Sequence, residues 1–192
     1  VLCRWIPYFV YALLSLAILG SLLFPKYILS LDMLFTPKMN FSVQYYGLWE
    51  GVTARAPLTF LIQFTSGIIP VWILQKLILF GAFFLAGLGA HKLLPNKGTG
   101  SYFAGIFYMV NPFTYVRFIS GQWPFVLAYA VTPFAVKAFL DMLESGRRRN
   151  TIKVAILSTL VGIAFIHALL LLFLTFLVLF IIRIIMKRRD PA

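Results

Sequence analysis

Two acidic residues lie where a carboxylate could do chemistry. Asp32 stands in the sequence SLDMLFTP and Glu50 in YYGLWEG, each among apolar and aromatic neighbours. A carboxylate at an apolar surface can act as a general base or bind a divalent metal ion, because partial desolvation makes it more basic. We therefore treat Asp32 as a candidate catalytic residue and a candidate metal ligand. A helix cap or a solvated loop acid is an equally good interpretation.

A second candidate region is the sequence NPFTYVRFISGQWP, which holds Arg117, Gln122 and Trp123. A guanidinium group can bind phosphate through two parallel hydrogen bonds, so Arg117 is a candidate for substrate binding. Its alternative role is to reach the lipid headgroups from a membrane helix. The sequence from Gly121 to Pro124 predicts a tight reversal of the chain, with Trp123 at the membrane surface. Gln122 is the residue of this turn whose side chain has hydrogen-bonding groups to spare.

Two further residues could contribute to binding. His167 stands between two apolar runs, where a lone histidine is more often a packing residue than a ligand. Arg55 ends a mixed, aromatic-rich segment that also contains Glu50. We include Glu50, His167 and Arg55 among the candidate substrate-binding residues. Asn111-Pro112 is expected to break a helix, with the asparagine side chain bonding the freed carbonyls.

The composition places these residues in a membrane protein. Of the 192 residues, 61% are hydrophobic and 11% are charged, whereas about 25% are charged in a typical soluble domain. The apolar blocks lack the alternation of a barrel, so we expect an all-α polytopic transmembrane bundle in the lipid bilayer. The chain has 17 Lys and Arg against five Asp and Glu. Most basic residues flank apolar blocks, which indicates contact with lipid headgroups and argues against nucleic acid as a partner.

About six spans, with five to seven as the range, account for the apolar blocks. A long outer loop, residues 25–70, is expected to follow the first span and to carry interfacial helices, one of them in PLTFLIQFTSGII. Together these form one membrane module over residues 1–192. The predicted spans are 6–24, 71–94, 101–119, 124–143, 152–166 and 168–186.

Charge decides how the last apolar block, residues 152–186, is divided. Basic clusters lie at residues 147–149 before it and at residues 187–189 after it. Two crossings with a turn near residues 162–167 put both clusters on the cytoplasmic side, as the positive-inside rule prefers. Both ends of the chain are then cytoplasmic in a plasma-membrane protein. The outer face collects the loop of Asp32, the turn after Arg117 and the turn of His167.

The order of these features resembles a known enzyme class. A first span, an outer loop with the acid of SLDMLFTPKMNFSVQYYGLWEG, a span ending GLGAHKLL and then YMVNPFTYVRFISGQWPFVLAYAVTPF are similar to the N-terminal part of GT-C glycosyltransferases, especially arabinofuranosyltransferase-like proteins. The resemblance implies transfer of a sugar from a polyprenyl-phosphate carrier to a glycan or glycoprotein acceptor on the extracytoplasmic face. Asp32 matches the loop acid, as base or as ligand of Mg²⁺ or Mn²⁺, and Arg117 matches the arginine after Asn-Pro-Phe. Because such enzymes are much longer, the resemblance also implies a larger parent protein.

Two other functions remain open at this point. A non-enzymatic subunit that packs against partner membrane chains is compatible with the many phenylalanines and the small residues of FGAFFLAGLGAHK. A transporter is less favoured, because Lys76 is the best ionisable candidate within a span and has no obvious acidic partner in the sequence.

Overall fold

The computed structural model describes residues 5–33, 35, 55–95 and 98–189, without the side chains of residues 187–189. Glu50 lies outside the described residues, as do residues 34 and 36–54 of the predicted outer loop. Within these ranges the protein is helical and contains no strand, which confirms the all-α prediction. The elements are α1 (Ile6–Leu19), the 3-10 helix η2 (Gly20–Leu23), α2 (Ala56–Ser66), α3 (Val71–Leu93), α4 (Thr99–Val110), α5 (Pro112–Ile119), α6 (Trp123–Ser145), α7 (Arg148–Ala164) and α8 (Ile166–Arg189).

Prolines mark where several of these helices begin. Pro7, Pro57, Pro112 and Pro124 each occupy one of the first two positions of α1, α2, α5 and α6 respectively. The first amides of a helix have no intrahelical acceptor, so the donor that proline lacks is not missed there. The helix starts can therefore be read directly from the local sequence.

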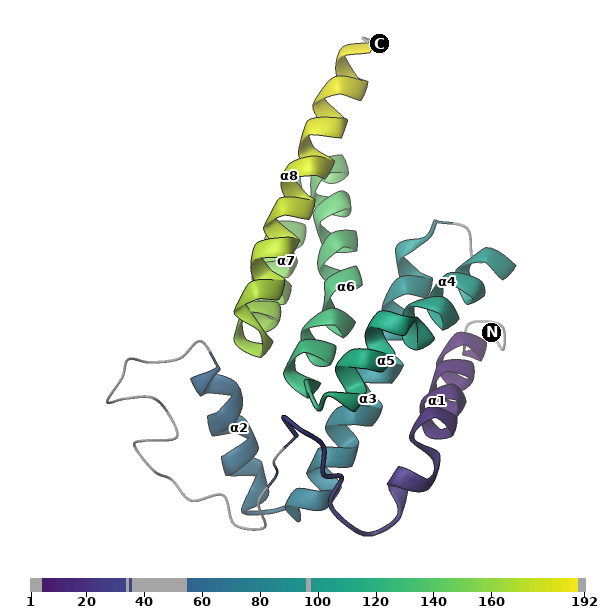
Figure 1. Ribbon diagram of the computed structural model, residues 1–192. Helices are drawn as coiled ribbons and strands as arrows, with labels where there is room; N and C mark the ends of the chain where they lie inside the picture. Colours follow the sequence, from purple (N-terminus) through teal and green to yellow (C-terminus); the bar gives the residue numbers. More distant parts are fainter. Residues whose placement is uncertain (1–4, 34, 36–54, 96–97, 190–192) are drawn as a thin grey trace.

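The helix α3 is the centre of the bundle. It packs against α1, α4 and α6, while α7 lies along the other side of α6 and α8 lies against α6 and α7 (Figure 1). Buried apolar residues form two clusters, one among α1, α3, α4 and α6 and one among α6, α7 and α8. The C-terminal half of α8 extends beyond the other helices. The helix α6 thus joins the two halves of the core.

Small residues let α1, α3 and α4 approach closely. The ring of Tyr11 on α1 is fully buried against Gly87 on α3 and Gly105 on α4. Its hydroxyl lies 3.1 Å from Nδ1 of His91 and donates to the carbonyl of Ser101. Glycine at both positions leaves room for the phenol, which is the close packing expected of small residues in membrane helices.

Replacing Gly105 with alanine is expected to lower the free energy of unfolding by about 1–3 kcal/mol, the usual effect of overpacking a core. An added Cβ would collide with the Tyr11 hydroxyl and would lie 2.7 Å from the Gly87 carbonyl oxygen. Unfolding by SDS in mixed micelles would measure the change. Gly100→Ala on the same helix is the control, because a Cβ there meets nothing within 4 Å. Equal stability of the two variants would contradict the packing described for Tyr11.

Four helical segments of the described chain are long and apolar enough to cross a membrane. They are Ile6–Leu23, Val71–Leu93, Trp123–Ser145 and Ile166–Met186. These agree with four of the predicted spans and with an integral membrane protein. The predicted fifth span is the 17-residue helix α7, and the turn after it lies at Phe165, within the predicted 162–167. The count of six crossings stays a prediction.

The predicted third span, 101–119, is not one continuous helix. It is divided at Asn111 into α4 and α5, because Pro112 cannot supply the hydrogen bond that would continue α4. The side-chain nitrogen Nδ2 of Asn111 donates to the carbonyls of Phe107 at 3.2 Å and Tyr108 at 3.0 Å. Its side-chain oxygen accepts from the backbone N–H of Thr114 at 3.0 Å. The expected role of Asn111 is confirmed.

Candidate functional site

A non-helical segment, residues 24–33, brings Asp32 to the rest of the site; we call it the Asp32 arm. It leaves η2, crosses the start of α3 and ends beside the turn between α5 and α6 (Figure 1). Ser30 Oγ donates to the Ile119 carbonyl, and the Asp32 amide donates to the Ser120 carbonyl at 3.1 Å. The Met33 amide closes a turn on the Ser30 carbonyl at 2.9 Å. The arm is thereby bound through its backbone to the end of α5.

The turn between α5 and α6 requires a glycine where the Asp32 arm meets it. Gly121 has φ +76°, a left-handed conformation, and is buried. A Cβ at this position would lie 2.6 Å from the Met33 amide nitrogen and 2.8 Å from that of Asp32. Only a residue without a side chain allows this approach. The chain reverses at residues 120–122, slightly earlier than the predicted 121–124, because Trp123 and Pro124 already belong to α6. This turn also forms the contact surface for the arm.

Asp32, Gln122 and Arg117 form a hydrogen-bonded row across this contact. The Gln122 amide nitrogen donates to Oδ2 of Asp32 at 3.4 Å. The Gln122 amide oxygen accepts from Nη1 of Arg117 at 2.7 Å. The structure therefore brings Asp32 to the pair Gln122 and Arg117, 90 residues away from Gln122 in the sequence, with a neutral amide between a carboxylate and a cation. Asp32 is exposed, and Arg117 and Gln122 are half-buried.

Two aromatic rings hold the guanidinium of Arg117. Its central carbon lies 5.3 Å from the centre of the Phe113 ring and 5.2 Å from that of Phe125. These two rings also contact each other edge to face, with centres 5.4 Å apart. Cation–π attraction fixes the plane of the guanidinium while leaving its N–H edge available for acceptors such as phosphate oxygens. These contacts orient the guanidinium, and its role in binding phosphate stays a prediction.

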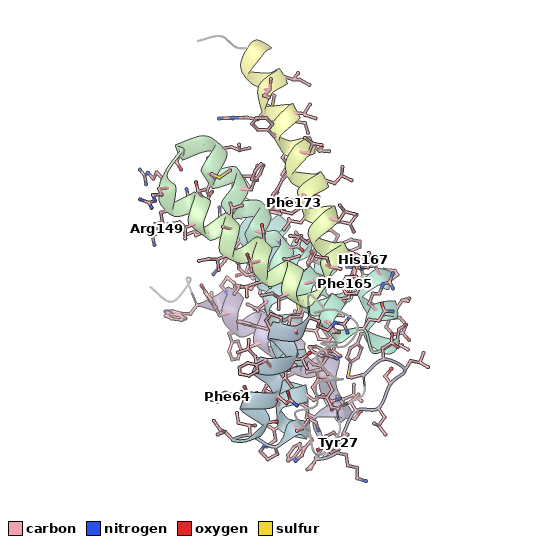
Figure 2. The ribbon with its side chains drawn as sticks, turned by 90° about the vertical axis from the view of Figure 1, so that its left-hand side faces the viewer. Tyr27, Phe64, Arg149, Phe165, His167 and Phe173 are labelled. Carbon is pink, nitrogen blue, oxygen red and sulfur yellow. The ribbon has the colours of Figure 1, made fainter. Side chains whose placement is uncertain are left out.

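The structure places the remaining candidates differently. The Trp123 ring packs on the buried Phe35 at 5.3 Å, which secures the start of α6. His167 is exposed, and its ring centre lies 5.3 Å from that of Phe165. Figure 2 labels both residues where α7 meets α8. Phe165 in turn meets Phe125 at 4.9 Å, so the α7–α8 turn reaches the same end of the bundle as Arg117.

His167 and Arg55 do not join the hydrogen-bonded row in the part of the chain that the structure describes. His167 has its ring contact with Phe165. Arg55 is exposed at the N-terminus of α2, where its carbonyl accepts from the Thr59 amide at 3.0 Å. Their roles in binding stay predictions, as does that of Glu50, which lies outside the described residues.

Sequence reasoning did not foresee that two residues of α3, Gln75 and Lys76, support the Asp32 arm. Gln75 is fully buried, and its carboxamide accepts from the Ile28 amide at 2.9 Å and donates to the Ile28 carbonyl at 2.8 Å. Lys76, also buried, donates to the Phe24 carbonyl and lies 5.2 Å from the Trp72 ring centre. The sequence did contain a sign of this role, because Gln75 and Lys76 are adjacent polar residues inside an apolar span, where polar side chains need a partner.

Lys76 was the best ionisable candidate for transport within a span, although the sequence showed no obvious acidic partner for it. The structure gives it a backbone carbonyl as partner instead. A cation that caps the end of η2 has a structural role. The sequence argument for a transporter therefore loses its main residue.

The described residues offer little to a divalent metal ion. Over residues 5–33, 35, 55–95 and 98–189 no group of three or more His, Cys, Asp and Glu side chains lies close enough to hold one. Asp32 is the carboxylate available at the site, and the Gln122 oxygen already accepts from Arg117. Asp32 is thus the carboxylate that this part of the chain could offer to Mg²⁺, an ion that usually keeps several water ligands.

Comparison with known proteins does not assign the chain to a family. No family model matches the chain, and neither a curated protein nor a solved structure matches it. A carboxylate and an aromatic-bound guanidinium, joined through one amide, can serve a ligand that carries both a hydroxyl to be deprotonated and a phosphate to be neutralised.

Proposed function

We propose that this protein is the membrane part of a glycosyltransferase that takes a sugar from a polyprenyl-phosphate carrier. The observation that carries the proposal is the hydrogen-bonded row of Asp32, Gln122 and Arg117 at one end of the bundle. Glycosyl transfer needs a base for the acceptor and positive charge for the departing phosphate. Asp32 supplies the base and Arg117 the positive charge, and the side-chain amide of Gln122 lies between them.

In the reaction, an acceptor hydroxyl oxygen attacks the anomeric carbon of the sugar. A bond forms between these atoms while the bond from the anomeric carbon to the phosphate oxygen breaks. The hydroxyl proton passes to the Asp32 carboxylate, and the electron pair of the broken bond stays on the phosphate, whose charge Arg117 neutralises. Gln122 keeps the carboxylate and the guanidinium apart, so neither is consumed in a direct ion pair.

The membrane setting suits a lipid-linked donor. Exposed apolar side chains on α5 and α8, including Tyr115, Val116 and Leu170, offer surfaces along which a polyprenyl chain can lie. With both ends of the chain cytoplasmic, the row faces the extracytoplasmic side, where a glycan or glycoprotein acceptor would approach. A divalent ion on Asp32 would add positive charge near the phosphate.

The proposal is tested in vesicles that contain the purified protein and a panel of polyprenyl-phosphate sugars. Release of polyprenyl phosphate and labelling of an added glycan acceptor are measured together. Transfer that requires the protein supports the proposal. Absence of transfer from every donor, together with absence of saturable donor binding by the folded protein, would overturn it.

Replacing Arg117 with lysine is expected to raise KM for the donor about tenfold, a typical effect of weakening a hydrogen bond to a charged group. Lysine keeps the charge but loses the planar fork and its stacking on Phe113 and Phe125. Donor-concentration series in the vesicle assay give KM. Lys92→Arg is the matched control, because Lys92 donates to the Tyr8 hydroxyl elsewhere in the bundle. An unchanged KM for Arg117→Lys would remove Arg117 from the phosphate site.

A second candidate function, a membrane subunit for partner chains, is favoured by α8. Its buried positions Ala168, Leu172 and Phe176 form one narrow stripe, whereas large apolar residues on its other faces are exposed. Such faces can meet lipid or another membrane helix. A stoichiometric membrane partner that copurifies in mild detergent, with no effect of Asp32 or Arg117 variants on cell-envelope glycans, would favour this function.

A further inference from the structure

Gln75 holds the Asp32 arm in the manner of a neighbouring strand. One carboxamide satisfies both the amide and the carbonyl of Ile28, at 2.9 Å and 2.8 Å. The side chain is fully buried, so water cannot replace these bonds. Irregular backbone that is shielded from water is tolerated only where protein groups satisfy its hydrogen bonds. Gln75 meets that requirement at the middle of the arm.

The arm is fixed on two sides. On the α3 side, Gln75 binds Ile28 and Lys76 binds the Phe24 carbonyl. On the other side, the Asp32 amide binds the Ser120 carbonyl of the α5–α6 turn. Only three residues lie between Ile28 and Asp32, so the point held by Gln75 limits where the carboxylate can lie.

We propose that Gln75 is a positioning residue that fixes the Asp32 carboxylate opposite Gln122 and Arg117 by pairing with the backbone of Ile28. Gln75 does not itself contact Asp32 in the structure, so it acts through the arm. The geometric part of this proposal concerns the distance between positions 32 and 122. Its consequence for catalysis rests on the proposed glycosyltransferase function.

The geometric part is tested by cross-linking, without any assay of transfer. Cys3, the single cysteine, is replaced by serine, and Asp32→Cys and Gln122→Cys are introduced into the full chain. A short bis-methanethiosulfonate reagent then reports how often the two positions approach. The two cysteine substitutions also remove the hydrogen bond between Asp32 and Gln122. The distance between positions 32 and 122 then depends on the other contacts that hold the Asp32 arm, including those of Gln75.

In this background Gln75→Met is expected to slow cross-linking about tenfold, because both bonds to Ile28 are lost while the side-chain volume is kept. Gln75→Glu in mildly acidic buffer is expected to keep the parent rate, since the protonated acid offers the same donor and acceptor. Leu79→Ala is the control for general loosening, because Leu79 is buried one turn along α3 and its side chain makes no hydrogen bond. It should leave the rate unchanged.

Three outcomes would overturn the proposal. They are an unchanged rate in Gln75→Met, an equal loss in Leu79→Ala, and a faster rate in Gln75→Met than in Gln75→Glu at the same pH, which would indicate packing alone. If Gln75→Met yields no folded protein, Gln75→Asn takes its place, because its amide is one methylene too short to reach Ile28.

The catalytic consequence is measured with the native residues at positions 32 and 122. Gln75→Met is expected to lower kcat about tenfold and to leave KM for the donor nearly unchanged, because Arg117 is not displaced. A loss of cross-linking with full kcat would overturn the positioning role. Failure of the parent protein to transfer sugar would instead count against the proposed function, and the cross-linking result would stand by itself.

Discussion

Asp32→Asn is expected to lower the rate of sugar transfer by about 10²- to 10⁴-fold, the range in which a general base contributes. Asparagine can still accept the hydrogen bond from Gln122, so the geometry of the row is retained. Asp32 is exposed, and replacement of an exposed side chain usually changes stability by only about 0.5 kcal/mol. Rates are measured in reconstituted vesicles at saturating donor, with the amount of folded protein matched by size-exclusion chromatography.

Asp141→Asn is the matched control for this loss of charge. Asp141 pairs with Lys137 at 3.4 Å near the other end of α6, and both side chains are partly exposed. Such an exposed pair contributes about 0–1 kcal/mol, so the variant should transfer sugar at the parent rate. Full activity of Asp32→Asn would exclude Asp32 as the base, and an equal loss in both variants would indicate a nonspecific effect of charge.

Gly121→Ala is expected to lower the free energy of unfolding by about 2–4 kcal/mol and to remove most activity. About 1–2 kcal/mol of this comes from placing an L-residue in the left-handed conformation at φ +76°. The remainder comes from the collision of a Cβ with the backbone of Met33 and Asp32, which cannot move as a flexible side chain would. Unfolding in mixed micelles measures the stability.

Gly146→Ala separates conformational strain from collision. Gly146 also has positive φ, +61°, at the end of α6, but a Cβ there meets nothing within 4 Å. We expect it to lose only the strain contribution, about 1–2 kcal/mol, and to keep its activity. If Gly121→Ala behaved like Gly146→Ala in both measurements, the close contact between the Asp32 arm and the α5–α6 turn would be wrong.

Local patterns in the sequence were enough to place most helices. Proline at helix starts, the length of apolar blocks and the Asn111-Pro112 pair act within a few residues along the chain. The helix in residues 56–66 and the start of α3 after Pro70 were predicted for this reason. The turn at Phe165 was predicted instead from the basic clusters on both sides of residues 152–186. The residue types of the site were also visible, since charged side chains are rare in apolar segments.

The partners of these residues were not visible, because their contacts join parts of the chain that are far apart. Asp32 and Gln122 are 90 residues apart, and Gln75 and Ile28 are 47 apart. No periodicity links such positions. Lys76 illustrates the difficulty: the sequence showed a cation without an acid, and the structure shows that a backbone carbonyl of the chain satisfies it.

The sequence by itself determined an all-helical membrane protein, the approximate position of its helices and a short set of polar candidates. The tertiary structure decided which candidates meet: Asp32, Gln122 and Arg117 do, whereas His167 and Arg55 do not among the described residues. The physical reason is that helix formation and membrane insertion depend on local composition. The site depends on the close approach of two backbone segments at Gly121, which only packing of the whole bundle can set.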